Sequence, residues 1–185
     1  ALDPHEYQWA AALGNAKSNS IWEAALPADL ARPEPRCPDA IRRRWIRDKY
    51  DAQLWLGGSR PPPALHRHAS GWLHVSGSLL PTWKRRFIAV SDGVLRQYAD
   101  ESLASERGPP LPLAGLDIEP DADEPLLLRL GPSSAAHTPR PGRRKSVRPV
   151  LVVRAAAQRD ADEWVWVLYQ GCRLDRLPPG APTIV

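Results

Sequence analysis

The stretch WKRRFIAVSDGVLRQYA, residues 83–99, contains two short strand-like runs on either side of Asp92-Gly93. An Asp-Gly pair in this position is typical of a two-residue hairpin turn, because both turn residues need a positive φ. We therefore expect two antiparallel strands. Side chains alternate along a strand, so Lys84 and Arg86 should share one face of the sheet and Arg85 and Phe87 the other.

More strands are expected on both sides of this hairpin. The stretch SGWLHVSGSLL, residues 70–80, alternates, with Trp72 on one face and Leu73 and Val75 on the other. Further short strands are expected around residues 111–113, 116–118, 126–130 and 150–153. The period then becomes helical after the capping-box pattern of residues 160–163, with an inner face made by Trp164, Val167, Leu168 and Cys172. Seven strands and one C-terminal helix predict an α+β fold.

The first 58 residues predict three helices and no strand. The first begins at Asp3, the second runs from Asn15 to about Leu26, and the third opens near Pro38-Asp39. We expect the third helix to turn five residues inward, namely Ile41, Trp45, Ile46, Tyr50 and Leu54. Arg42, Arg43, Arg44, Arg47 and Lys49 should lie on its polar side. A helical segment of this size is marginal alone, so we expect this chain, which begins at Ala1 and has no methionine, to be a piece of a longer protein.

Composition restricts the classes of partner. The net charge is +4, and residues 59–185 carry all of the excess, with seventeen Lys or Arg against thirteen Asp or Glu. This bias favours an anionic partner. Cys37 and Cys172 lie far apart, which indicates a reducing compartment without a disulfide framework. No apolar run reaches 18 residues, so no membrane-spanning segment is expected.

Three stretches of the N-terminal part resemble the C-terminal half of the GTPase-activating domain for ADP-ribosylation factors, the ArfGAP domain. These stretches are LGNAKSNSIWEAALP, ARP and RRRWIRDKYDAQLWL, residues 13–27, 31–33 and 42–56. The resemblance implies an Arf-family small GTPase as partner. The family's zinc ligands and catalytic arginine lie upstream of the matched segment, so this chain is expected to hold no cofactor and no catalytic residue, and zinc is expected only in the missing upstream part. Cys37 has no partner cysteine and is not expected to bind metal.

The C-terminal part resembles a pleckstrin-homology (PH) domain. The matching residues are Gly71-Trp72-Leu73, Trp83 to Phe87, Asp92-Gly93-Val94-Leu95, Tyr98 and Glu163-Trp164. The resemblance implies that Trp164 plugs the open end of a small barrel. Trp22, Trp45 and Trp164 are our candidates for the structural core, whereas Trp83 and Trp166 are expected to be partly exposed.

The cation block of residues 84–86 is the candidate lipid-binding site. PH domains that bind inositol phosphates have a cation pair with the spacing of Lys84 and Arg86, and Arg85 or His74 could assist. The family's further lysine on the first strand is replaced here by Val75. Basic residues near an anionic leaflet contribute roughly 1 kcal/mol each, so we expect weak, nonselective binding of phosphoinositide or other anionic membranes, roughly 2–4 kcal/mol in total. The alternative is a solvated amphipathic strand that binds no lipid.

A basic, proline-rich stretch, HTPRPGRRKSVRP at residues 137–149, interrupts two strands. We expect a disordered insertion near residues 132–148. Its cations could add to the membrane-facing charge, and phosphorylation of Ser146 could then weaken that attraction. The auxiliary basic residues are Arg143, Arg144, Lys145 and Arg148.

The sequence therefore predicts four parts: the end of an ArfGAP domain at residues 1–57, a proline-rich linker at 58–69, a PH domain at 70–175 and a tail at 176–185. We find no pattern for an intrinsic enzyme active site. His66 and His68 lack the further ligands that a metal site needs. The helix of residues 42–47 offers no stacking surface for nucleic acid. We expect a cytoplasmic, peripheral membrane protein that acts in GTPase regulation and membrane trafficking, with a non-catalytic protein-interaction adaptor as the alternative.

Overall fold

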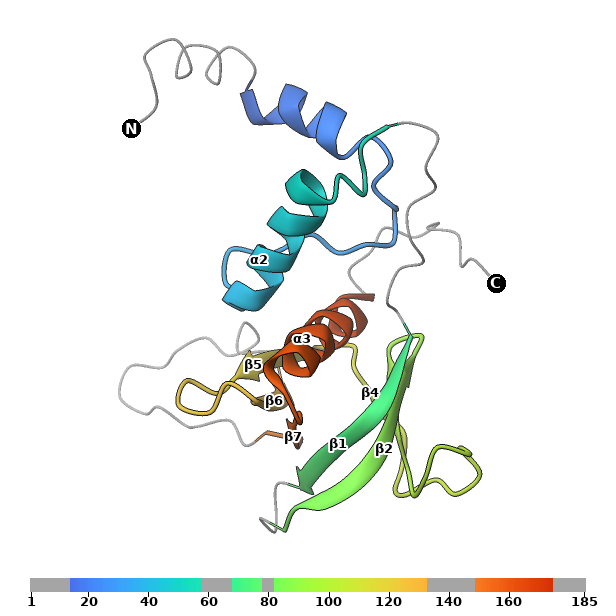
Figure 1. Ribbon diagram of the computed structural model, residues 1–185. Coiled ribbons are helices and arrows are strands. Elements are labelled where there is room, and N and C mark those ends of the chain that lie inside the picture. The colour runs from blue at the N-terminus through green and yellow to red at the C-terminus, as the bar shows by residue number, and fades with distance from the viewer. Residues whose placement is uncertain (1–13, 58–67, 78–81, 133–148, 175–185) are drawn as a thin grey trace.

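The computed structural model describes residues 14–57, 68–77, 82–132 and 149–174 (Figure 1). Within these residues, seven antiparallel strands form one sheet in the order β4-β3-β2-β1-β7-β6-β5. A helix, α3 (Gln158–Cys172), follows the last strand and packs on the sheet (Figure 1). The predicted α+β fold of seven strands and a C-terminal helix is confirmed. The strands are β1 (Ala69–Gly77), β2 (Lys84–Ser91), β3 (Val94–Tyr98), β4 (Leu111–Pro112), β5 (Leu116–Pro120), β6 (Leu127–Pro132) and β7 (Leu151–Arg154).

The turn between β2 and β3 is the tight hairpin that Asp-Gly predicts. Asp92 and Gly93 have φ values of 50° and 73°, which is the left-handed pair that a type I′ turn requires. Ser91 and Val94, on either side of the turn, pair with each other as the last pair of the β2–β3 register. A Cβ atom on Gly93 would lie 2.7 Å from Cδ1 of Leu174, so the end of α3 is packed directly against this turn.

The core lies between the sheet and α3. Trp164 is 7% exposed, and its Cζ2 would lie 3.5 Å from a Cβ atom on Gly71 of β1. Burying an indole of this size contributes several kcal/mol. The strand residues that share this core include Leu73, Val75, Ile88, Val90, Leu95, Leu128, Leu130 and Val153.

Helix α3 begins earlier than the sequence predicts. It starts at Gln158 with Ala157 as N-cap, and no side chain caps it, so the predicted capping box at residues 160–163 is wrong. Asp160 lies in the first turn instead, where a carboxylate interacts favourably with the helix dipole. Trp166 is 2% exposed, which contradicts the expectation that it is partly exposed.

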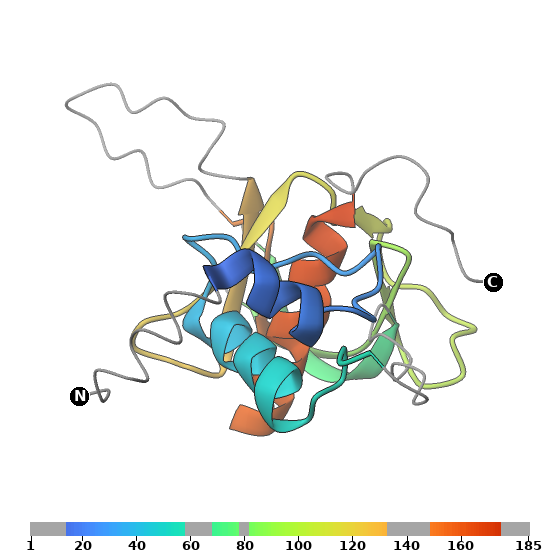
Figure 2. The same ribbon diagram turned by 90° about the horizontal axis from the view of Figure 1, so that it is seen from above.

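Trp166 is buried because a second layer of helices covers the side of α3 that faces away from the sheet (Figures 1 and 2). Residues 14–22 are helical, α2 spans Asp39–Ile46, and a π-helical turn, η1, continues from it over Arg47–Asp51. Arg44 of α2 lies over the Trp166 ring at 5.8 Å and its guanidinium reaches Glu163 at 2.5 Å. Helix α3 is therefore buried on both sides.

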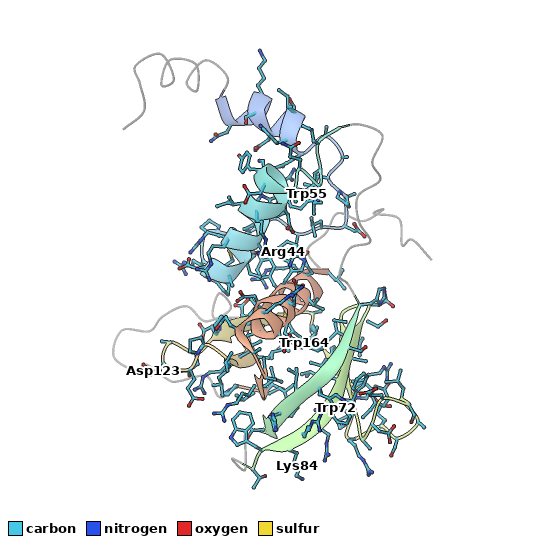
Figure 3. All side chains as sticks on the ribbon, in the orientation of Figure 1. Arg44, Trp55, Trp72, Lys84, Asp123 and Trp164 are labelled. Atoms are coloured by element: carbon cyan, nitrogen blue, oxygen red, sulfur yellow. The ribbon has the colours of Figure 1, made fainter. Side chains whose placement is uncertain are left out.

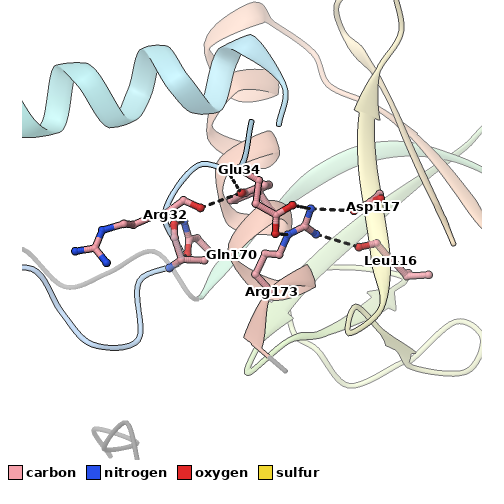
Figure 4. Close-up of polar contacts among 8 residues, drawn as sticks. Arg32, Glu34, Leu116, Asp117, Gln170 and Arg173 are labelled. Atoms are coloured by element: carbon pink, nitrogen blue, oxygen red, sulfur yellow. Dashed lines mark hydrogen bonds and ion pairs between the residues drawn. The ribbon is translucent and has the colours of Figure 1, made fainter. Parts of the chain in front are cut away.

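The irregular segment of residues 31–34, which precedes α2, is bound to α3 through its backbone (Figure 4). The side-chain amide of Gln170 accepts from the backbone N–H of Ala31 at 2.8 Å. The hydroxyl of Tyr169 donates to the carbonyl of Arg32 at 3.1 Å and accepts from the backbone N–H of Glu34 at 3.0 Å. These bonds satisfy backbone groups that an irregular segment would otherwise leave unpaired in the interface.

Arg173 joins three parts of the chain at the end of α3 (Figure 4). Its guanidinium donates to Glu34 at 3.0 Å and lies 2.9 Å from Asp117 of β5, although its side chain is only 8% exposed. It also stacks on Tyr169 at 4.8 Å. Since both helical layers and the sheet contribute to one cluster of buried side chains, the described residues share a common core.

The third predicted helix differs from expectation in which side chains it buries. Ile41 and Trp45 are buried as expected, and Trp45 lies 4.4 Å from the buried ring of Trp55. Ile46 and Tyr50, which were expected inside, are 54% and 43% exposed. The helical period itself explains this, because at 100° per residue Ile46 and Tyr50 lie away from the face that Ile41 and Trp45 share. The η1 turn continues the helix, with the backbone N–H of residue 52 donating to the carbonyl of residue 47 at 2.9 Å.

Other predictions fall on residues that the structure does not describe. The helix expected from Asp3 to about residue 13 lies there, as do most of the linker, the basic insertion and the tail. Trp22, a candidate core residue, is half-buried and its ring lies 5.2 Å from that of Tyr50. No helix in the described part of the chain is both long and apolar enough to cross a bilayer.

Candidate functional site

Two cations of β2 lie on the face of the sheet that carries the core. Lys84 pairs with Val75 and Arg86 with Leu73 of β1, and these two partners are 6% and 2% exposed. Directly opposed residues of antiparallel strands point to the same face. Arg86 is half-buried and Lys84 is exposed, because the core ends at this point and the sheet continues into solvent.

Neither cation is neutralised by a carboxylate within the part of the chain that the structure describes. The one hydrogen bond of their side chains runs from the Arg86 guanidinium to the carbonyl of Arg85 at 3.3 Å, and no ion pair joins Lys84 or Arg86 to another described residue. Other arginines of the sheet are paired: Arg129 with Asp121, and Arg154 with Glu124 at 2.5 Å. The two charges at the end of β2 are thus available to an external anion.

Arg85 belongs to the opposite face. It pairs with His74, and its guanidinium stacks on the indole of Trp72 at 4.4 Å. The Trp72 indole N–H donates to Glu101 at 2.6 Å and its ring contacts Phe87 edge-on at 5.5 Å. The structure therefore separates the three residues 84–86 of the candidate site into a pair and a stacked third member.

An exposed indole directly precedes the cation pair in the sequence. Trp83 is 38% exposed, and the guanidinium of Arg154 lies 4.6 Å from its ring centroid. Because Arg154 pairs with His74 of β1, this stack lies on the face of Arg85, opposite to that of Lys84 and Arg86. An indole with a polar N–H and an apolar ring suits the boundary between water and lipid. Sequence reasoning expected Trp83 to be partly exposed but gave it no functional role.

Val75 lies at the position of β1 where the family resemblance predicts a third cation. It lies between Lys84 of β2 and Val153 of β7 in register and is 6% exposed. A cation at this position would face the same side as Lys84. Its replacement by valine leaves the described rim with two cations on the core-bearing face.

The basic insertion begins and ends beside this rim. Leu151, at the start of β7, pairs with both Gly77 of β1 and Leu130 of β6. The described chain therefore leaves the sheet after Pro132 and re-enters it at Leu151, opposite Gly77 at the end of β1. The auxiliary cations and the candidate phosphorylation site lie outside the described residues, namely Arg143, Arg144, Lys145, Ser146 and Arg148.

The described residues form no group of His, Cys, Asp and Glu side chains suited to a metal ion. His68 lies 3.1 Å from the hydroxyl of Ser91, and Cys37 and Cys172 are buried free thiols. Burial raises the pKa of the Cys37 thiol, which keeps it protonated and unreactive at neutral pH.

The residues shared with the ArfGAP pattern form an internal network. Lys49 Nζ donates to Asn19 at 2.5 Å and to Glu23 at 2.6 Å, and both members of the Lys49–Glu23 pair have side chains only 5% exposed. Arg32 donates to the other oxygen of Glu23 at 2.8 Å. The Lys49 and Glu23 side chains are buried between the helices, whereas Asn19 and Arg32 are exposed at the edge of this network.

No protein-family profile matches the chain. Among solved structures, it is similar to the PH domain of human oxysterol-binding protein-related protein 11, with 19% identity over 70% of this chain and all of that one, at a TM-score of 0.47. It is also similar to the C-terminal PH domain of pleckstrin in complex with an inositol pentakisphosphate, with 16% identity over 57% of this chain and 97% of that one, at a TM-score of 0.43. A third similar structure is the Slm1 PH domain in complex with inositol 4-phosphate, with 14% identity over 56% of this chain and 94% of that one, at a TM-score of 0.42.

Proposed function

We propose that residues 68–174 act as a PH-type module that binds anionic, phosphoinositide-containing membranes through the rim made by Lys84 and Arg86, with Trp83 preceding it at the start of β2. The observation that carries the proposal is the pair of adjacent cations on the core-bearing face without a carboxylate partner in the described chain. Two such cations contribute roughly 1 kcal/mol each near an anionic leaflet, and the exposed indole adds apolar contact. The expected binding is weak and dependent on salt.

The test is co-sedimentation of the 185-residue chain with vesicles that contain phosphatidylserine or phosphatidylinositol 4,5-bisphosphate, against neutral phosphatidylcholine vesicles. We expect Lys84→Glu/Arg86→Glu to abolish sedimentation with both anionic compositions. The matched control is Arg43→Glu/Arg47→Glu, which makes the same change in net charge at exposed positions of α2 and η1 and should retain binding. Equal loss in both variants would mean that net charge alone drives binding and would refute a specific rim.

A comparison of soluble inositol phosphate with vesicles separates headgroup binding from surface attraction. If the rim selects a headgroup, soluble inositol 1,4,5-trisphosphate should compete with vesicles at concentrations near its own dissociation constant. The valine at position 75 favours the opposite result, in which only the charged surface binds. Competition at low micromolar concentration would contradict this nonselective interpretation.

We further propose that the intact protein regulates Arf-family small GTPases, on the resemblance of residues 13–56 to the end of an ArfGAP domain. A GTPase activator supplies an arginine to the nucleotide site in trans. Because that arginine and the zinc site belong to the family's upstream segment, this chain alone should not accelerate GTP hydrolysis. Single-turnover hydrolysis by an Arf protein, with and without the 185-residue chain on anionic vesicles, tests this; acceleration would refute it.

The second candidate function is a non-catalytic adaptor. One observation favours it: Ile46 at the end of α2 and Tyr50 of η1 are exposed, where their apolar side chains are available to another protein. Unchanged GTP hydrolysis together with specific peptide binding would favour the adaptor.

A further inference from the structure

The end of α2 and the η1 turn expose apolar side chains and bury charged ones, which we call the inversion. Ile46 and Tyr50 are 54% and 43% exposed, whereas Asp48 and Lys49, which lie between them in sequence, are 7% and 4% exposed. A buried charged pair and an exposed apolar pair are each uncommon, and here they occur in one turn. The exposed apolar area of Ile46 and Tyr50 is available to another surface.

The inversion is fixed by buried polar contacts. Asp48 accepts from Arg44 at 2.8 Å, and Lys49 donates to Asn19 and Glu23 at 2.5 and 2.6 Å. Rotating the turn to bury Ile46 and Tyr50 would pull both charged groups away from these partners and leave them buried without a partner, which is strongly unfavourable. The apolar side chains are therefore held outward by the fold.

The first described helix contacts this turn through Trp22. The ring of Tyr50 lies 5.2 Å from that of Trp22, and the adjacent Ile21 is 47% exposed. Ile21, Ile46 and Tyr50 make up half of the six exposed large apolar residues in the described chain. We call this part of the surface the helical face. Its members are the apolar residues Ile21, Trp22, Ile46 and Tyr50 and the neighbouring arginines Arg43 and Arg47.

Arg43 and Arg47 border the apolar residues. Their spacing of three and four residues from Ile46 and Tyr50 places them on the same side of the helix. Both are exposed, and neither forms an ion pair with another residue that the structure describes. Arg42 and Arg44, in contrast, are paired with Asp39 and with Asp48 and Glu163. The helical face therefore combines apolar contact area with two uncompensated positive charges.

We propose that the helical face binds an acidic segment of a partner protein whose apolar side chains pack against Ile46 and Tyr50 while its carboxylates pair with Arg43 and Arg47. A second copy of this chain fits poorly, because it would bring the same two arginines together. A bilayer fits poorly as well, because Lys84 lies at the opposite end of the molecule from Arg44 and Trp55 (Figure 3). A protein bound to a membrane through the Lys84 rim would present the helical face to the surrounding solution.

The exclusion of a bilayer rests on the proposed membrane contact of Lys84 and Arg86, and the test is arranged so that failure of either proposal is distinguishable. A random peptide library displayed on phage is selected on the full 185-residue chain, and the binding of selected peptides is measured by fluorescence polarisation. We expect enrichment of peptides that combine Asp or Glu with aliphatic or aromatic residues. Ile46→Ser/Arg47→Glu should weaken binding by about tenfold or more, and raising the salt concentration should weaken it further.

The matched control is Lys84→Glu/Arg86→Glu, which should bind the selected peptides as the unchanged chain does. Thermal unfolding of each variant verifies that Ile46→Ser/Arg47→Glu leaves the fold intact. The proposal is overturned if no peptide is selected, if the selected peptides lack acidic residues, or if they bind the Ile46 variant equally well.

Three other outcomes would assign a different occupant and also overturn the proposal. Loss of vesicle binding on Ile46→Ser/Arg47→Glu would identify a bilayer. A concentration-dependent dimer in sedimentation equilibrium that disappears in this variant would identify a second copy. Tighter peptide binding after Tyr7→Ser/Trp9→Ser would identify the chain's own N-terminal residues, which lie outside the described part.

Discussion

Strand β2 and the α2–η1 helix each carry a block of cations, yet only the strand exposes the side chains that its sequence predicts. Along β2, Ile88 and Val90 are buried on the face of Arg86, as a period of two requires. Along the helix, we expected Ile46 and Tyr50 inside, but the structure buries Asp48 and Lys49, which at 100° per residue lie nearer to the face of Ile41 and Trp45. A strand offers two orientations to each side chain, whereas each helical residue advances by 100°, so the five-residue spacing from Ile41 to Ile46 already leaves the buried face.

The difference also separates two uses of a lysine. Lys84 at the end of β2 is exposed and without a carboxylate partner in the described chain, so its charge remains available to a ligand. Lys49 in η1 is 4% exposed and donates hydrogen bonds to Asn19 and Glu23, so its charge is neutralised within the fold. Exposure and pairing, rather than the presence of a basic block, distinguish a binding cation from a structural one.

The largest expected effect is on the buried lysine. Lys49→Ala should lower the free energy of unfolding by about 3–5 kcal/mol, because it leaves the 5%-exposed carboxylate of Glu23 without its main partner. Lys84→Ala should change it by no more than about 0.5 kcal/mol. Urea denaturation followed by tryptophan fluorescence measures both. Similar values for the two variants would remove the distinction between the two lysines.

The next effect compares two isoleucines five residues apart. Ile41 is fully buried, so Ile41→Ala should destabilise the protein by about 2–5 kcal/mol through lost burial and a cavity. Ile46 is 54% exposed, so Ile46→Ala should change stability by about 0.5 kcal/mol or less. The same denaturation assay applies. A large loss on Ile46→Ala would mean that the side chain is covered in solution and would contradict the inverted turn.

The sheet could be predicted from the sequence because its signals are local. The Asp92-Gly93 turn fixes one hairpin, and alternation assigns Lys84 and Arg86 to one face without knowledge of the remaining chain. The position of the valine at 75 opposite Lys84 follows from the same alternation. The candidate rim was therefore predictable in its main features, except for the role of Trp83, whose stacking on Arg154 joins residues 71 positions apart.

The helical layer could not be predicted to the same extent because its burial is set by long-range contacts. Trp166 was expected to be partly exposed, since nothing in the sequence near it indicates that Arg44 and α2 cover it. The burial of Lys49 likewise involves Asn19 and Glu23, to which it donates hydrogen bonds across 30 and 26 positions of the chain. Amphipathic periodicity assumes one core on one side of a helix, and α3 has a packed layer on both.

A smaller effect tests whether that second layer is joined firmly to α3. Tyr169→Phe removes the hydroxyl that bonds to the carbonyl of Arg32 and the N–H of Glu34, and should cost about 1 kcal/mol. Tyr98→Phe is the matched control, since no hydrogen bond of its hydroxyl is found among the described residues, and it should be neutral. Equal stability of the two variants would indicate that the layer around residues 31–34 is only loosely attached.

The smallest effect is a pH dependence of stability that arises from Glu23 in the helical layer. Burial opposes ionisation of Glu23, but hydrogen bonds and charges from Lys49 and Arg32 outweigh it, so the pKa of Glu23 lies below its usual value of 4.5. The ionised form is therefore favoured by folding, and this contribution is complete above pH 4.5 and is lost as the pH falls through the folded pKa. Carboxyl carbon-13 NMR measures that pKa directly. Arg32→Gln, which removes an exposed partner, should raise the pKa of Glu23 while leaving the Lys49 contact in place. An unchanged pKa in that variant would show that Arg32 does not contribute and that Lys49 alone holds the carboxylate ionised.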